Sequence, residues 1–229
     1  MQLIVQDSVL PQLITAAIEA YEFKHHGRGK AMLETIGLLW GYVLRFDEER
    51  QHRQIVATIA TVETYAVRHQ NWAMPNYKSI KSKRKFFQEH WPEVELIGTF
   101  HTHPYFNLSE TKINKGWEAS DGNDDGEPGD RQFWPQFHRD ICPDMPCLMH
   151  LVIAITKLEK AGWAAPRRMK GKHHDYAYVF SSSDKKMWIN SYATNLSPRK
   201  DTSDDNEYVV DDNANLFVPS LVERFSHDE

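Results

Sequence analysis

The stretch Leu96-Ile97-Gly98-Thr99-Phe100-His101-Thr102-His103-Pro104 decides the fold around it. Its apolar and β-branched first half predicts a buried strand, and Pro104 ends the run. Because the side chains of a strand alternate between its two faces, His101 and His103 project to the same side. Two imidazoles on one face at a strand end suit a transition metal, although a pair of core or surface histidines gives the same pattern in a chain with 12 histidines.

The composition limits the classes of function that fit the chain. Its 229 residues are enough for one domain with a sizeable core. The formal net charge of −5 argues against nucleic acid as the main partner. There is no apolar run of membrane-spanning length and no signal-peptide pattern, so we expect no membrane association. Cys142 and Cys147 offer no disulfide framework, so we expect a reducing, cytoplasmic location.

Hydrophobic periodicity predicts alternating helices and strands. The expected helices cover residues 9–23 and 76–90 and a segment that begins at 130; the expected strands cover 2–6, 34–44, 55–62, 96–104 and 148–156, with a hairpin of 176–180 and 186–192. Residues 105–129 are expected to form a long polar loop, and residues 197–213 an acidic linker or a partly ordered segment. This order of elements is typical of an α+β fold with a mixed sheet.

The predicted helix over residues 76–90 has a strongly basic face. Its cationic residues are Lys78, Lys81, Lys83, Arg84 and Lys85. Such a face is either an ordinary solvated surface or a docking surface for an acidic partner, and the sequence leaves both interpretations open.

Two histidines leave a catalytic zinc ion one protein ligand short, since such a site holds three protein ligands and a water molecule. The chain should therefore offer one acid as a ligand and a second acid as a base for the attacking water. Glu34 heads an otherwise apolar strand and is a candidate for the base. An acid at an exposed strand end would explain the same pattern without any function.

The segment Glu34-Thr35-Ile36-Gly37-Leu38-Leu39-Trp40-Gly41, followed by Gly98-Thr99-Phe100-His101-Thr102-His103-Pro104, resembles the JAMM/MPN family of zinc metalloproteases. That family carries Glu-x-x-Gly-Leu-Leu-x-Gly, then His-Ser/Thr-His-Pro, then Ser-x-x-Asp at a helix start. The resemblance covers residues 1–156 and is to the bacterial stand-alone type. It implies Glu34 as general base, His101 and His103 as zinc ligands, and a curved sheet flanked by helices, in the cytidine-deaminase-like MPN/JAB architecture.

The resemblance also implies a function. A zinc isopeptidase or peptidase of this type acts after the C-terminal tail of ubiquitin or a ubiquitin-like modifier, with a water activated by Glu34 as nucleophile. Its partners are a ubiquitin-like protein or its conjugates, together with E1/E2-like conjugation enzymes. The implied domains are a metallopeptidase domain over residues 1–196 and an acidic C-terminal extension over 197–229. An inactive scaffold of the same family and a metal-dependent hydrolase of small amides are the alternatives.

The third motif departs from the family pattern. The usual spacing after His103 reaches Thr111 and Asn114, where the family has serine and aspartate. Residues 127–134 begin a predicted helix before the next apolar strand, which is where the family places its aspartate. Asp130 lies in the first turn of that helix. We therefore predict that Asp130 is the third zinc ligand.

Other residues of the polar loop remain alternatives for the third motif. Asp121, Asp124 and Asp125 are the other candidates for the third ligand. If Asp130 is the ligand, Glu127 stands in the serine position, and an ionised carboxylate cannot stabilise an oxyanion. Ser109 and Ser120 are then the candidates to reach the site from the loop.

Overall fold

The computed structural model describes residues 1–23, 31–47, 52–122, 128–169, 177–198, 206–219 and 221. The helices of this part are α1 (Val9–Glu22), α2 (Tyr77–His90), α3 (Leu108–Ile113) and α4 (Asp130–Ile141). Its strands are β1 (Gln2–Val5), β2 (Ile36–Asp47), β3 (His52–Val62), β4 (Val67–Arg68), β5 (Ala73–Met74), β6 (Glu95–Tyr105), β7 (Cys147–Lys157), β8 (Ala164–Arg168), β9 (Tyr178–Ser182), β10 (Lys185–Pro198), β11 (Asn206–Asp211) and β12 (Asn215–Phe217).

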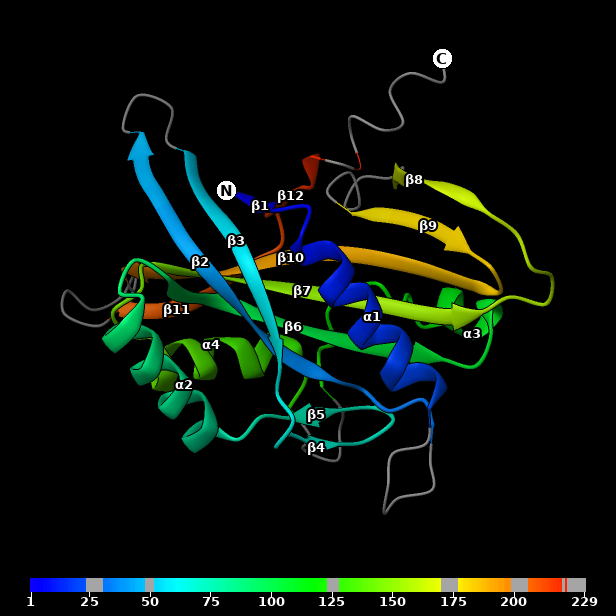
Figure 1. Cartoon of the computed structure of the whole chain (residues 1–229), viewed down its shortest axis with the longest axis horizontal. Helices are drawn as coiled ribbons and strands as arrows, with labels where there is room; N and C mark the ends of the chain where they lie inside the picture. The colour runs from blue at the N-terminus through cyan, green and yellow to red at the C-terminus, as the bar shows by residue number, and fades with distance from the viewer. Residues whose placement is uncertain are drawn as a thin grey trace.

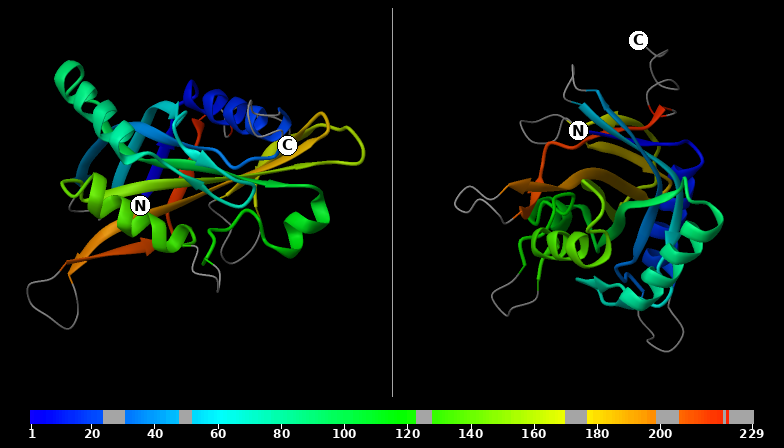
Figure 2. Two further views of the ribbon diagram at one scale, coloured as in Figure 1. Left: turned by 90° about the horizontal axis from the view of Figure 1, so that it is seen from below. Right: turned by 90° about the vertical axis from the view of Figure 1, so that its left-hand side faces the viewer.

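Ten of these strands form one mixed sheet (Figure 1). Its order is β12-β1-β3-β2-β6-β7-β10-β9-β8, and β11 pairs with β10. The pairs β1–β12, β1–β3 and β6–β7 are parallel, and the other pairs of this sheet are antiparallel. Because each strand is rotated relative to its neighbour, so wide a sheet curls, and Figure 2 shows the result as a half-barrel.

The predicted fold class is wrong. The sequence indicated an α+β fold with a helix-flanked sheet of the cytidine-deaminase-like MPN/JAB type, whereas strands dominate the structure, with 43% strand against 26% helix. The physical reason is the width of the sheet, whose twist accumulates from strand to strand until it becomes a half-barrel. Helix α1 packs against β3, β6 and β7, and α4 packs against β7, β10 and β11.

Unlike the fold class, the predicted positions of the individual helices and strands are largely confirmed. Each helix and strand predicted between residues 2 and 192 is present with shifted ends. The predicted loop over 105–129 is interrupted by α3, which Asn107 caps by accepting a hydrogen bond from the Glu110 N–H. Within the segment 197–213, predicted as a linker or a partly ordered stretch, residues 206–211 form β11, and β12 of the predicted extension also joins the main sheet.

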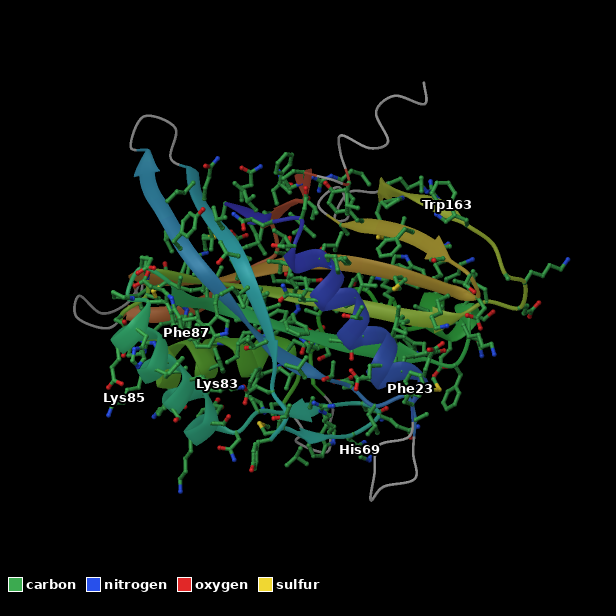
Figure 3. The ribbon with its side chains drawn as sticks, viewed as in Figure 1. Phe23, His69, Lys83, Lys85, Phe87 and Trp163 are labelled. Atoms are coloured by element: carbon green, nitrogen blue, oxygen red, sulfur yellow. The ribbon has the colours of Figure 1, made fainter. Side chains whose placement is uncertain are left out.

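The basic face of α2 is largely neutralised by neighbouring acids. Figure 3 shows Lys83, Lys85 and Phe87 along this helix. Three of its cations form ion pairs: Lys83 with Glu63, Arg84 with Asp144 and Lys85 with Glu89. The Phe87 ring stacks on Trp40 with the ring centroids 4.2 Å apart. These contacts favour the interpretation of α2 as a packed, solvated helix over that of an acidic partner's docking surface.

Strands β6 and β7 lie in the middle of the sheet and carry the candidate site. Leu96 to His103 and Cys147 to Thr156 are buried throughout, as expected for neighbouring parallel strands that are covered on both faces. Gly98 lies opposite Met149 in this pair. Every helix in the part of the chain described here is too short or too polar to cross a lipid bilayer.

We expect Gly98→Ala to destabilise the fold severely. A Cβ atom at Gly98 would lie 1.8 Å from the Met149 carbonyl oxygen, so the two central strands would have to separate. Overpacking of this kind costs about 3 kcal/mol of unfolding free energy, measured by urea denaturation. Gly162→Ala is the control, because nothing lies within 4 Å of a Cβ there, and its effect should stay within about 0.5 kcal/mol. Equal stability of the two variants would contradict this account of the β6–β7 contact.

Candidate metal centre

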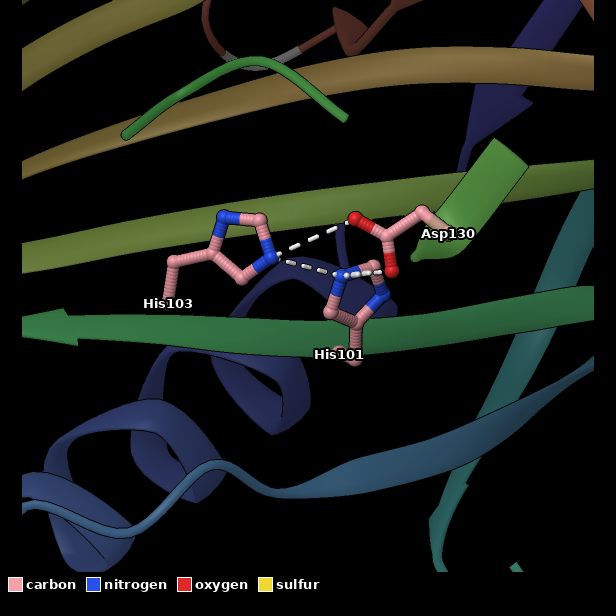
Figure 4. A group of neighbouring side chains, drawn as sticks. All are labelled: His101, His103 and Asp130. Atoms are coloured by element: carbon pink, nitrogen blue, oxygen red, sulfur yellow. Dashed lines mark hydrogen bonds and ion pairs between the residues drawn. The ribbon is translucent and has the colours of Figure 1, made fainter. Parts of the chain in front are cut away.

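His101 and His103 project from the same face of β6, as their spacing predicts. Both side chains are buried, with 5% and 8% of their surface exposed. Their Nε2 atoms lie 3.0 Å apart (Figure 4). Two imidazole nitrogens at this distance can bind the same metal ion or share one proton.

Asp130, the first residue of α4, completes the group. Its Oδ1 lies 3.0 Å from His101 Nε2, and its Oδ2 lies 3.4 Å from His103 Nε2 (Figure 4). The three possible ligand atoms lie within 4.8 Å of one another. This group could hold a metal ion, since two imidazoles and a carboxylate are a ligand set used by catalytic metal sites.

Further hydrogen bonds orient two of these three side chains. The His103 Nδ1–H donates to the Gly116 carbonyl oxygen at 2.8 Å, which leaves Nε2 for the metal. The Ser120 N–H and Oγ–H both donate to Asp130 Oδ2, at 2.8 and 2.9 Å. The Asp130 N–H donates in turn to Ser120 Oγ at 2.9 Å, which satisfies one of the free N–H groups of the helix start. Ligands fixed in this way favour metal binding over mobile side chains.

Glu34 reaches the same face through the pairing of β2 with β6. Ile36 lies opposite His101, the Thr35 N–H donates to Thr102 Oγ1 at 2.9 Å, and the Thr102 N–H donates to the Thr35 carbonyl at 3.0 Å. Continuing this antiparallel register puts Glu34 opposite His103. Residues that are directly opposite project to the same face of a sheet, so Glu34 lies beside both histidines. Its side chain is buried, with 7% exposed.

The four residues open into one cavity of about 590 Å³. The β4–β5 turn forms one wall with Gln70, Asn71 and Trp72, and the segment that follows β6 forms another. Of the described residues that line the cavity, Glu34, Glu110 and Asp130 carry carboxyl groups and none is lysine or arginine. The cavity therefore suits neutral or cationic groups better than phosphates or carboxylates.

The charges of the site are strongly coupled. Burial opposes ionisation of Asp130, but the charges and hydrogen bonds of His101 and His103 hold its pKa well below the usual value. Burial likewise opposes protonation of His103, yet the hydrogen bond and charge of Asp130, together with Glu34, raise its pKa to about 9. Burial raises the pKa of Glu34 to about 8, with the Asp130 charge adding to the effect and His103 opposing it. A divalent cation bound here would replace the His103 proton and favour the ionised form of Glu34.

The structure brings Glu34, His101, His103 and Asp130 to one cavity, and their roles as base and ligands stay predictions. Asp121 lies outside this group, with 82% of its side chain exposed and its carboxylate paired with Arg131. The alternative residues Asp124, Asp125 and Glu127 lie outside the described residues.

Of the two serine candidates, only Ser120 lines the cavity, and it contacts Asp130; Ser109 lies on α3 and does not line it. Sequence reasoning missed three groups at the site: Glu110, the β4–β5 turn and Gly116. None of them belongs to a recognisable metal motif, and their places depend on how distant segments pack. Thr111, in the family's serine position, is buried and donates its hydroxyl to the Asn107 carbonyl instead.

Comparison with known proteins assigns neither a family nor a function to this site. No protein-family model and no curated protein matches the chain. The candidate metal centre therefore depends on the contacts described above.

We expect Asp130→Ala to lose the metal and Asp121→Ala to keep it. Removing Asp130 leaves two imidazoles, whereas Asp121 is an exposed residue whose surface ion pair contributes little. The measurement is zinc per chain after dialysis, by atomic emission spectrometry. Full occupancy in Asp130→Ala, with loss in Asp121→Ala, would reverse the choice of ligand.

The metal-free chain should lose stability between pH 7 and pH 9. His103 has a folded pKa of about 9 against an ordinary value of 6.5, so its stabilising contribution is complete below about pH 6.5 and is lost as pH rises through about 9. Glu34 is buried as a neutral acid, so its contribution is lost as pH rises from 4.5 through about 8. Urea unfolding with a chelator present should show a decrease on the order of 3 kcal/mol. An increase over this range would contradict the described charge coupling.

Proposed function

We propose that this chain is a zinc-dependent hydrolase of amide bonds, acting after the C-terminal tail of a ubiquitin-like protein. The proposal depends on one observation. Glu34 lines the same cavity as His101, His103 and Asp130, which lie close enough together to bind one metal ion. The motifs around Glu34 and His101 resemble those of the JAMM metalloproteases, which supports this class of reaction. The proposal depends on the site and not on the fold, which differs from the expected one.

The three ligand residues fit zinc better than they fit calcium or magnesium. Imidazole nitrogen is a common zinc ligand, whereas calcium and magnesium prefer oxygen ligands. His103 has the outer hydrogen bond to a backbone carbonyl that is typical of metal-binding histidines. When bound, zinc would polarise a carbonyl group and lower the pKa of a water molecule to about 7.

Glu34 is the group placed to move protons. It is not one of the three ligand residues, and it lies on the same face as the two histidines. Its carboxylate would take a proton from the attacking water and pass it to the departing amine. A buried carboxyl group with a raised pKa suits both steps, because proton transfer is most efficient when the pKa lies near the working pH.

An open strand edge supports an extended peptide as the substrate. The chain ahead of β2 stays hydrogen-bonded to β6 as far as Thr35 and Thr102, while β6 continues beside β7 as far as Tyr105. Among the described residues, Pro104 and Tyr105 of β6 therefore have a paired strand on the β7 side alone, and the Tyr105 carbonyl also accepts a hydrogen bond from the Tyr21 hydroxyl. An extended tail could add along the other side and bring its scissile bond to His101 and His103. Partners of this kind are a ubiquitin-like protein, its conjugates and E1/E2-like conjugation enzymes.

A hydrolase of small amides is the second candidate. The cavity volume of about 590 Å³ lies within the range of about 300–1,000 Å³ for small-ligand sites. Parallel assays on a ubiquitin-like protein joined to lysine by an isopeptide bond, and on small amides without the protein part, distinguish the two. Cleavage of the small amides alone would favour the second candidate.

We expect Glu34→Gln to keep zinc and lose turnover. The amide has nearly the shape of the carboxylate but cannot accept the proton, and loss of a general base lowers the rate by about 10²–10⁴-fold. Zinc content and initial rates on isopeptide-linked conjugates are measured on the same sample. Glu89→Gln, the same change on the exposed side of α2, should leave both values unchanged. Undiminished turnover of zinc-loaded Glu34→Gln would remove Glu34 from the reaction.

A further inference from the structure

Residues 116–121, between α3 and α4, form a strap that contacts two of the three ligand residues. At one end, the Gly116 carbonyl accepts the Nδ1–H of His103. At the other end, Ser120 donates two hydrogen bonds to Asp130 and accepts one from its N–H. The strap thus joins a ligand on β6 to a ligand on α4, and its position sets the distance between them.

Gly116 brings the strap close to the strand that carries the histidines. A Cβ atom at this position would lie 2.1 Å from the Tyr105 ring. The absence of a side chain lets the Gly116 carbonyl come within 2.8 Å of His103 Nδ1. The Gly116 N–H is held by the Thr111 carbonyl at 2.8 Å, so this end of the strap is fixed to α3.

One face of β10 holds the middle of the strap. Trp188, Asn190 and Tyr192 alternate along the strand and therefore project to the same side. The Asn190 Nδ2–H donates to the Trp117 carbonyl at 3.2 Å, and the Ala119 N–H donates to the Tyr192 hydroxyl oxygen at 2.9 Å. The Asn190 Nδ2 group also donates to that oxygen at 2.8 Å, and the Trp117 ring stacks on Trp188.

We infer that Tyr192 and Asn190 are positioning residues for the metal, which they influence through the strap and without touching it. The inference depends on the metal-binding role proposed for His101, His103 and Asp130. Tyr192 and Asn190 fix the backbone between Gly116 and Ser120, and these two residues fix His103 and Asp130. Loss of the Tyr192 hydroxyl should therefore let the two ligands move apart.

Simple core packing is the other explanation for Tyr192, and the structure offers a way to separate the two. Its ring packs against Trp134 and Val152, and phenylalanine would preserve that packing. Its hydroxyl group, by contrast, is hydrogen-bonded to the strap backbone at Ala119. A packing role therefore predicts no effect of Tyr192→Phe on metal affinity, whereas a positioning role predicts a loss.

The test compares metal binding by the full-length parent chain, Tyr192→Phe and Tyr178→Phe. Tyr178 is an equally buried tyrosine on β9, opposite Ile189, so it projects to the other face of the sheet from Tyr192. Zinc dissociation constants come from competition with a chromophoric chelator, and the absorption spectrum of bound Co²⁺ reports the geometry of the ligands. Chelator-treated proteins are unfolded in urea to measure the stability of the fold itself.

We expect Tyr192→Phe to bind zinc about 10–100-fold more weakly, with an altered Co²⁺ spectrum, as is usual for changes in groups that support metal ligands. Tyr178→Phe should match the parent in both measurements. Asn190→Ala should weaken zinc binding in the same direction, and it serves as the test if Tyr192→Phe does not fold. Parent-like zinc affinity and Co²⁺ spectrum in folded Tyr192→Phe and Asn190→Ala would overturn this inference alone. A parent chain that binds no zinc would overturn the proposed function together with it.

Discussion

The pairing of Thr35 with Thr102 is the contact on which the candidate site depends. Two hydrogen bonds between these residues, at 2.9 and 3.0 Å, set the register of the chain ahead of β2 against β6. In this register Glu34 faces His103, and Ile36 faces His101. A slip of one residue would turn Glu34 to the opposite face of the sheet, because strand side chains alternate. The proximity of acid and histidines is therefore a property of strand pairing, and the side chains need little freedom to keep it.

The remaining residues of the site come from segments that follow β6 in the chain. Helix α4 brings Asp130 within 3.4 Å of both histidines, and the strap of residues 116–121 holds that carboxylate and His103 from the outside. Burial disfavours the charged form of a side chain in this group, so an ionised residue needs an opposite charge or a hydrogen bond from its neighbour to stay ionised. His103 and Asp130 stabilise each other as an ion pair in the metal-free chain. A metal ion would take the place of the shared proton, which couples metal binding to proton release.

The sequence contains more local signals for the candidate site than for the fold. Strand periodicity and two motifs are local signals that single out Glu34, His101 and His103, and the helix start near Pro128 singles out Asp130; their roles stay predictions. The sequence does not predict the width and curl of the sheet, because β8, β11 and β12 are short strands of mixed polarity and because twist accumulates over strands that are distant in sequence. The hydrogen bond from the Ala119 N–H to the Tyr192 hydroxyl joins residues that are 73 positions apart, and no local sequence pattern predicts such a contact. Asn190 and Tyr192 have the alternation of an ordinary strand, so no local pattern indicates their place beside the strap.

The central claim is that His101, His103 and Asp130 hold one zinc ion with Glu34 beside it. Anomalous diffraction at the zinc edge from crystals of the purified chain tests this most directly. The account predicts one strong peak per chain, about 2.0–2.2 Å from the two Nε2 atoms and one Asp130 oxygen, with the Glu34 carboxylate outside the ligand set. A peak at another group of residues, a site that includes Glu34 in place of Asp130, or no peak from zinc-soaked crystals would contradict it.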